Sequence, residues 1–229
     1  MPTNKQESLR QLLADLHAER VATMAPDALQ INIDQRQLLV DTVDRTRFAR
    51  VGATLASFSL EEISQGEVTL DGLLERGPVV LIFFRFAGCP ACNIALPYYQ
   101  RQLAPGLKEL GATLVAVSPQ VPERLADIKL RHDFDFLVAS DRDNELARQL
   151  GILYTFNQAS QQAALANGKT IGEVTGTGTW ELPMPTALVI DRERVIRFID
   201  VAPDWLVRTE AETILAAVKE IIAEQQFPA

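Results

Sequence analysis

The sequence predicts an α/β fold in which a central mixed β-sheet is flanked by helices and preceded by a helical extension. Two observations lead to this prediction. From residue 79 onward, short apolar runs typical of strands alternate with helical patterns, and the last two strands precede an amphipathic helix. The first fifty residues have only helical periodicity. We therefore expect an N-terminal helical extension over residues 1–50 and a domain over residues 51–229.

The extension is expected to contain two amphipathic helices. The first has Thr3 and Gln6 in a capping-box spacing, and Pro26 separates it from the second. Its apolar face consists of leucines at i, i+3, i+4 and i+7: Leu9, Leu12, Leu13 and Leu16. Such helices cannot bury themselves, so they must dock on the domain or on another chain. Because a symmetric dimer is the commonest solution, we expect a homodimer with these helices in its interface.

The domain has the pattern of an open sheet with covering helices. Strands are expected at 79–84, 113–117, 136–139, 186–190 and 195–199, with a turn at 191–194. Helices are expected at 90–110, 123–132 and 144–150. The final helix is expected to begin with a capping box of Thr209 and Glu212 and to bury one apolar stripe: Ile214, Leu215, Val218, Ile221 and Ile222. Residues 155–180 predict a helix and a loop inserted near the active face.

Composition restricts the partners and the compartment. A net charge of −8 is unlike a nucleic-acid-binding or anionic-membrane surface. No run approaches the roughly 20 apolar residues of a spanning helix, and the N-terminus lacks the pattern of a secretory leader. The chain has only two cysteines, whereas a secreted disulfide scaffold would use more. These features predict a cytoplasmic protein.

The two cysteines form a Cys-Pro-Ala-Cys motif at 89–92, where a strand is expected to turn into a helix. Backbone N–H groups at a helix N-terminus favour an anion, so Cys89 is expected to be the exposed, low-pKa thiol. Pro90 suits the first helical turn because its missing N–H has no partner there. Cys92 lies one turn further on the same face and can form a disulfide with Cys89. The motif predicts that Cys89 attacks and Cys92 resolves.

Other interpretations of the cysteine pair are weaker. Half of a zinc site would need further ligands, and the sequence offers only His17 and His132, far apart. An inert buried pair is disfavoured by the position at a helix start. No motif calls for a metal or an organic cofactor.

The segment around the motif resembles the peroxiredoxin-like branch of the AhpC/TSA family, within the thioredoxin-like superfamily. That branch carries an aromatic-Arg-x-x-x-Cys-Pro-x-Cys-Asn motif, which Phe84-Arg85 and the run from Cys89 to Asn93 match. Similar segments are found at 116–120, 180–186 and 189–198. The resemblance covers roughly residues 52–222 and implies a thioredoxin-like fold. It also implies an active-site helix kinked at Pro97 and a cis-proline at Pro185 facing the cysteines.

The chain departs from these families at three helper positions. The resemblance places Phe86 where peroxidase-active peroxiredoxins have a hydroxyl that binds peroxide, and Pro185 where they have an arginine. Phe83 stands where thioredoxins have a buried aspartate.

Three other residues could supply the missing functions. Arg85 would lower the pKa of Cys89 or hold a substrate oxygen, unless it is a solvated arginine at a strand end. Glu181 would accept a proton between the cysteines, unless it is simply exposed. Trp180 would line the active-site groove, or it would pack as a partly buried side chain.

The resemblance and the motif together favour a thiol peroxidase that reduces hydrogen peroxide or organic hydroperoxides and is itself reduced by an external, thioredoxin-like dithiol. A protein disulfide oxidoreductase that meets its partners at Pro185 is the alternative. A third hypothesis is a binding module whose cysteines only sense the redox state.

Overall fold

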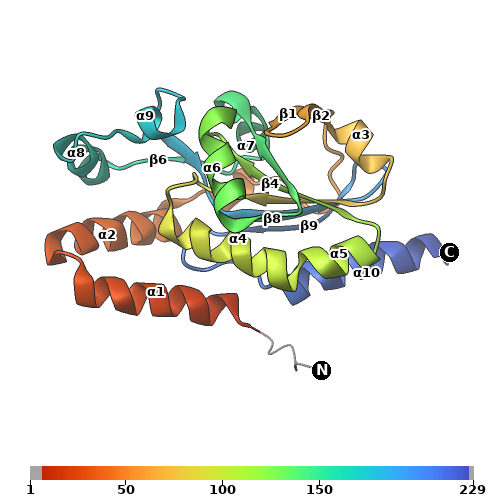
Figure 1. Cartoon of the computed structure of the whole chain (residues 1–229), viewed down its shortest axis with the longest axis horizontal. Helices are drawn as coiled ribbons and strands as arrows, with labels where there is room; N and C mark the ends of the chain where they lie inside the picture. Colours follow the sequence, from red (N-terminus) through yellow and green to blue (C-terminus); the bar gives the residue numbers. More distant parts are fainter. Residues whose placement is uncertain (1–6, 227–229) are drawn as a thin grey trace.

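A seven-stranded mixed sheet forms the centre of the computed structural model, which describes residues 7–226 (Figure 1). The strand order is β2-β1-β5-β4-β3-β8-β9. Strands β3, β4 and β5 are parallel, and β8 runs antiparallel to β3. The predicted α/β fold with a central mixed sheet is therefore confirmed. No helix within the described range is long and apolar enough to cross a membrane.

The strands agree with the sequence pattern where that pattern is continuously apolar. All five strands expected from the sequence are present, within two residues of the expected bounds at each end. A small separate sheet pairs β6 with β7. The strands are β1 (Ser59–Glu62), β2 (Gly66–Thr69), β3 (Val79–Phe83), β4 (Thr113–Ser118), β5 (Leu137–Ser140), β6 (Leu153–Thr155), β7 (Glu181–Pro183), β8 (Thr186–Ile190) and β9 (Ile196–Val201).

Helices cover both faces of the sheet. Expected helices are present at each predicted position, and several short ones are added. The helices are α1 (Leu9–Thr23), α2 (Pro26–Thr42), α3 (Leu70–Leu74), α4 (Pro90–Gln102), α5 (Ala104–Glu109), α6 (Pro122–His132), α7 (Glu145–Gln149), α8 (Gln158–Ala166), α9 (Ile171–Thr175) and α10 (Ala211–Gln226), with 3₁₀ turns at Arg45–Arg47 and Arg142–Asn144.

Strand β3 organises the core because it is buried on both sides. Val80 and Ile82 face a core shared with α1, α4, α6 and α10, whereas Leu81 and Phe83 face a second core under α3 and α7. Alternation of side chains along a strand explains this division. The strand that leads into the Cys-Pro-Ala-Cys motif is thus held rigidly from both faces.

The N-terminal helices dock on the domain of the same chain. Helix α1 packs along α4, and its Leu9 and Leu13 side chains are fully buried, with 0% exposure each. The Glu210 carboxylate, just before α10, accepts hydrogen bonds from the Leu9 and Arg10 N–H groups, both at 2.9 Å. These are unpaired N–H groups of a helix start, where a negative charge is favourable. The leucine face that led us to expect a homodimer is therefore covered within the chain.

Two expectations about helix ends need correction. The helix expected over 90–110 breaks at Leu103, because Pro105 has no N–H with which to continue the hydrogen-bond ladder. The Thr209 hydroxyl donates to Asp200 at 2.7 Å instead of capping α10, which begins two residues later. The expected cap of Thr3 and Gln6 lies outside the described residues. Pro97 does lie inside α4, as expected.

Candidate active site

The turn between β3 and α4 positions Cys89. The sheet ladder continues one residue past β3, where the Phe84 N–H donates to Val117. The chain then turns, with the Cys89 N–H donating to the Phe86 carbonyl at 3.1 Å. Cys89 is the N-cap residue of α4, and Pro90 occupies its first position, as the sequence predicted.

Two amide side chains hold this turn in place. The Asn93 amide donates to the carbonyls of Ala87 and Cys89, at 2.7 and 2.9 Å. The Gln120 side chain accepts from the Ala87 N–H at 2.8 Å and donates to the Val174 carbonyl in α9 at 3.0 Å. Because both amides contact main-chain atoms, the position of Cys89 is fixed independently of its sulfur.

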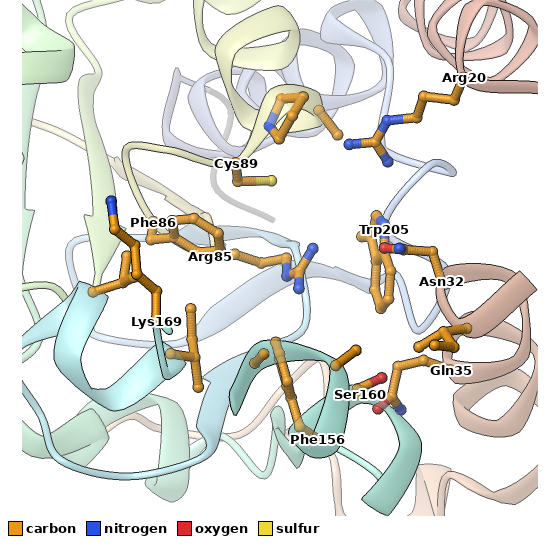
Figure 2. A pocket seen from close by; sticks show the side chains of 17 residues that line it. Arg20, Asn32, Gln35, Arg85, Phe86, Cys89, Phe156, Ser160, Lys169 and Trp205 are labelled. Atoms are coloured by element: carbon orange, nitrogen blue, oxygen red, sulfur yellow. The ribbon is translucent and has the colours of Figure 1, made fainter. Parts of the chain in front are cut away.

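The two free thiols are both buried, but only Cys89 faces a cavity. Cys89 is 1% exposed and Cys92 is fully buried. The cavity has a volume of about 280 Å³, and Figure 2 shows the Cys89 sulfur turned toward it. Its walls come from α1, α2, α4, the segment 156–174 and the loop after β9, and they include Arg20, Asn32, Gln35, Arg85, Phe86, Phe156, Ser160, Lys169, Ile171 and Trp205.

Arg85 places a buried cation beside Cys89. Its guanidinium carbon lies 4.1 Å from the centre of the Trp205 ring and about 6 Å from three other rings, those of Phe86, Tyr154 and Phe156. Arg85 is only 9% exposed, and its Nε atom has no hydrogen-bond partner among the described residues. The interpretation of Arg85 as a solvated arginine is therefore wrong.

A second buried arginine, Arg208, lies on the far side of the pair. Its Nη2 atom donates to the Cys92 sulfur at 3.4 Å, and its Nε atom donates to the Trp205 carbonyl at 3.0 Å. Arg208 lies in the connection between β9 and α10, so it approaches the cysteines from another part of the chain than Arg85 does. The two thiols thus lie between two guanidinium groups.

This environment shifts the pKa values of the two thiols in opposite directions. Burial raises the pKa of Cys89 well above its usual value, and the adjacent Cys92 raises it further. Burial acts in the same direction on Cys92, but the hydrogen bond from Cys89 and the charges of Arg208 and Arg85 outweigh it and hold the pKa of Cys92 well below its usual value. The hydrogen bond from Arg208 therefore favours the thiolate of Cys92 over that of Cys89. The expectation of an exposed, low-pKa Cys89 is wrong because its sulfur is buried, and this burial raises the pKa of the thiol.

A thiolate titration should separate the two protons of the pair. In the reduced protein we expect the absorbance near 240 nm to rise in two steps, one below and one above the value of about 8.5 for a free cysteine. In Cys92→Ser, Cys89 should titrate in one step at lower pH than the second step of the wild type, because a negative neighbour that opposes its ionisation is gone. Cys89→Ser, the matched control, should also show one step. A single two-proton step near pH 8.5 in the wild type would contradict this charge distribution.

Three residues predicted for the site lie away from the Cys89 sulfur. Glu181, in β7, forms an ion pair with Arg148 at 2.9 Å and does not line the cavity. Trp180 packs partly buried near Phe156, with ring centres 6.1 Å apart, behind the cavity wall.

Pro185 differs most from the expectation. No cis peptide bond occurs in the described part of the chain, so the bond before Pro185 is trans. Pro185 lines a separate space of about 10 Å³ together with Arg208. Pro185 therefore does not line the cavity at Cys89.

Comparison with known proteins agrees with this geometry. The AhpC/TSA family matches residues 51–199, which is most of the α/β domain and includes both cysteines. The chain belongs to the AhpC/TSA family. The resemblance that the motif indicated is thereby confirmed, as is the predicted class of enzyme, an oxidoreductase. Helices α1 and α2 lie before the matched segment of this AhpC/TSA protein.

Individual relatives of this AhpC/TSA protein are peroxiredoxins by name. A Mycobacterium tuberculosis protein named as a peroxiredoxin, Rv1608c, is 31% identical over 103 residues, which span 45% of this chain and 66%, just under two thirds, of that protein. The crystal structure of peroxidoxin BcpB from Mycobacterium tuberculosis is 25% identical, with a TM-score of 0.58, and covers 75% of this chain and 97% of its own. The reduced 2-Cys peroxiredoxin of Plasmodium vivax has a TM-score of 0.60 at 15% identity over 78% of this chain and 100% of its own, and it shares the fold.

Four residues of the site were not predicted from the sequence. Arg208, Trp205, Arg20 and Gln35 lie 54 or more positions from the nearest cysteine. No spacing rule connects them to the Cys-Pro-Ala-Cys motif. The only available signal for the pair after β9 was a tryptophan three residues before an arginine, close to the start of the final helix.

Proposed function

We propose that this AhpC/TSA protein is a thiol peroxidase in which Cys89 attacks a peroxide and Cys92 resolves the product. One observation supports this most directly. The Cys89 sulfur and the Arg85 guanidinium, whose Nε has no hydrogen-bond partner in the described part of the chain, face the same cavity (Figure 2). A nucleophile and a donor for the leaving oxygen are the two groups that cleavage of an O–O bond requires.

In the first step, the Cys89 sulfur attacks one peroxide oxygen and the O–O bond breaks. Cys89 becomes a sulfenic acid, and the leaving oxygen departs as water or an alcohol after protonation. Cys92, whose thiolate is stabilised by Arg208, accepts the Cys89 proton as the attack begins. This role was expected of Glu181, whose carboxylate is instead paired with Arg148. Arg85 stabilises the charge that develops on the leaving oxygen.

In the second step, the Cys92 sulfur attacks the Cys89 sulfenic acid. A disulfide forms and water is released. An external dithiol, of the thioredoxin type, then reduces the disulfide and returns both thiols. A reducing compartment such as the cytoplasm would supply this reductant.

Burial of both sulfurs disfavours the alternative, a protein disulfide oxidoreductase. With exposures of 1% and 0%, neither sulfur can contact a disulfide on the surface of another protein without rearrangement of α4. A peroxide, by contrast, is small enough to enter a cavity of about 280 Å³.

Stopped-flow measurements on the reduced, full-length protein test the proposal. We expect hydrogen peroxide to oxidise it with loss of two thiols per peroxide, and faster than disulfide exchange with insulin. A matched experiment with the pre-oxidised protein should show no reaction with peroxide. Faster exchange with insulin than reaction with peroxide would favour the oxidoreductase, and slow reactions with both would favour the redox-sensing module.

A further inference from the structure

The cavity over Cys89 is built partly by elements that lie outside the segment matching the family. Helices α1 and α2, which precede the family match, contribute Arg20, Ile31, Asn32 and Gln35 to its wall. The opposite wall comes from the segment that contains α8 and α9. The two walls meet where the Asn157 N–H donates to the Gln35 side-chain oxygen at 2.6 Å. The N-terminal extension thus closes the cavity on one side.

The charges in the cavity are all of one sign. Among the described residues, its lining includes the cations Arg20, Arg85 and Lys169 and no aspartate or glutamate. The whole chain, in contrast, has a net charge of −8. In Figure 2, Arg20 and Lys169 lie on opposite sides of the space in front of Cys89. A concave site lined by one sign of charge concentrates ligands of the other sign.

An unpaired buried donor adds a second and independent indication. Gln35 is 2% exposed, and its side-chain oxygen already accepts the Asn157 bond. That bond fixes the amide orientation, and the remaining nitrogen, Nε2, has no partner among the described residues. Buried donors are normally satisfied, so an oxygen of a ligand is the expected partner.

The rest of the lining is apolar. Phe156, Ile171 and Trp205 line the space between the polar groups. A volume of about 280 Å³ admits a small organic molecule but not a long chain. The complementary ligand is therefore a compact apolar body with an anionic group.

We propose that the cavity selects organic hydroperoxides that carry a carboxylate, with Arg20 binding the carboxylate and the peroxide directed at Cys89 and Arg85. This inference rests on the proposed peroxidase function and specifies its substrate class. The chemistry is unchanged, because the hydroperoxide is reduced to the corresponding hydroxy acid while the cysteine pair is oxidised.

Two matched probes test this selection, cumene hydroperoxide and its para-carboxylate. We expect the reduced wild-type protein to react at least tenfold faster with the carboxylate. In Arg20→Gln, the ratio of the two rate constants should fall toward one. Arg10→Gln is the matched control, because it removes the same charge from an exposed position on the same helix. Equal rates for the two probes in the wild type, or an unchanged ratio in Arg20→Gln, would overturn the proposal while leaving the peroxidase function intact.

A binding measurement separates this proposal from the peroxidase function itself. The parent acid, 4-isopropylbenzoate, has no peroxide group, and it should bind the wild-type protein by calorimetry and bind Arg20→Gln at least tenfold more weakly. If this binding is observed while neither hydroperoxide oxidises the protein, the carboxylate site stands and the peroxidase function fails. Absence of binding to the wild-type protein would overturn the carboxylate site whatever the rates.

Discussion

Arg85→Ala is expected to slow the oxidation of Cys89 by hydrogen peroxide by about 10²–10³-fold, the usual cost of losing one preorganised donor to a developing oxyanion. Arg85 is a buried cation beside Cys89 in the cavity, and Phe86 stands next to it where a hydroxyl would otherwise assist. The second-order rate constant from stopped-flow fluorescence measures the effect, since Trp205 stacks on Arg85.

Two variants control for charge and for structure. Arg85→Lys keeps the charge but loses the planar group that lies over the Trp205 ring, so an intermediate rate is expected. Arg148→Ala removes a surface arginine paired with Glu181 and should leave the rate unchanged. If the Arg85→Ala variant has the same melting temperature as the wild type and reacts with peroxide at the wild-type rate, the guanidinium has no part in the chemistry.

The sequence was most informative for elements whose own residues show which of their faces are buried. The run at 79–83 is apolar at every position, so its burial on both faces could be predicted without knowing its neighbours. The stripe of α10 likewise defines its own buried face. Strands β1 and β2 escaped prediction because they are only four residues long and each contains a single hydrophobic residue, so they lack a distinctive pattern.

The candidate site was predictable only along the Cys-Pro-Ala-Cys segment. Local spacing identifies Cys89, Cys92 and the start of α4, because a helix fixes which positions share a face. Arg208 and Arg20 reach the cysteines through packing of α10 and α1, which no local pattern encodes. The Glu181 carboxylate forms an ion pair with Arg148 instead of approaching the cysteines. The pairing of β6 with β7, which no local pattern predicts, brings these two residues near each other.

The cysteine variants are expected to have the largest and most different effects. Cys89→Ser should abolish oxidation by peroxide, because the remaining sulfur, Cys92, is fully buried and does not line the cavity. Cys92→Ser should still react once with peroxide but should not turn over with a dithiol reductant, because no second sulfur is available to form the disulfide. Trapping with dimedone should label the sulfenic acid of Cys92→Ser and leave Cys89→Ser unlabelled.

The comparison of Cys89→Ser with Cys92→Ser shows whether access to the cavity or negative charge on the sulfur determines which cysteine is the nucleophile. Arg208 donates a hydrogen bond to Cys92 and favours its thiolate, whereas the cavity reaches only Cys89. Proton transfer between adjacent sulfurs can move the charge to Cys89, but no comparable motion brings Cys92 to the cavity, because α4 holds it in the core. We therefore expect access to the cavity, and not negative charge, to determine which cysteine is the nucleophile. If Cys89→Ser instead forms the dimedone adduct and Cys92→Ser does not, Cys92 is the nucleophile and α4 must open before peroxide can react.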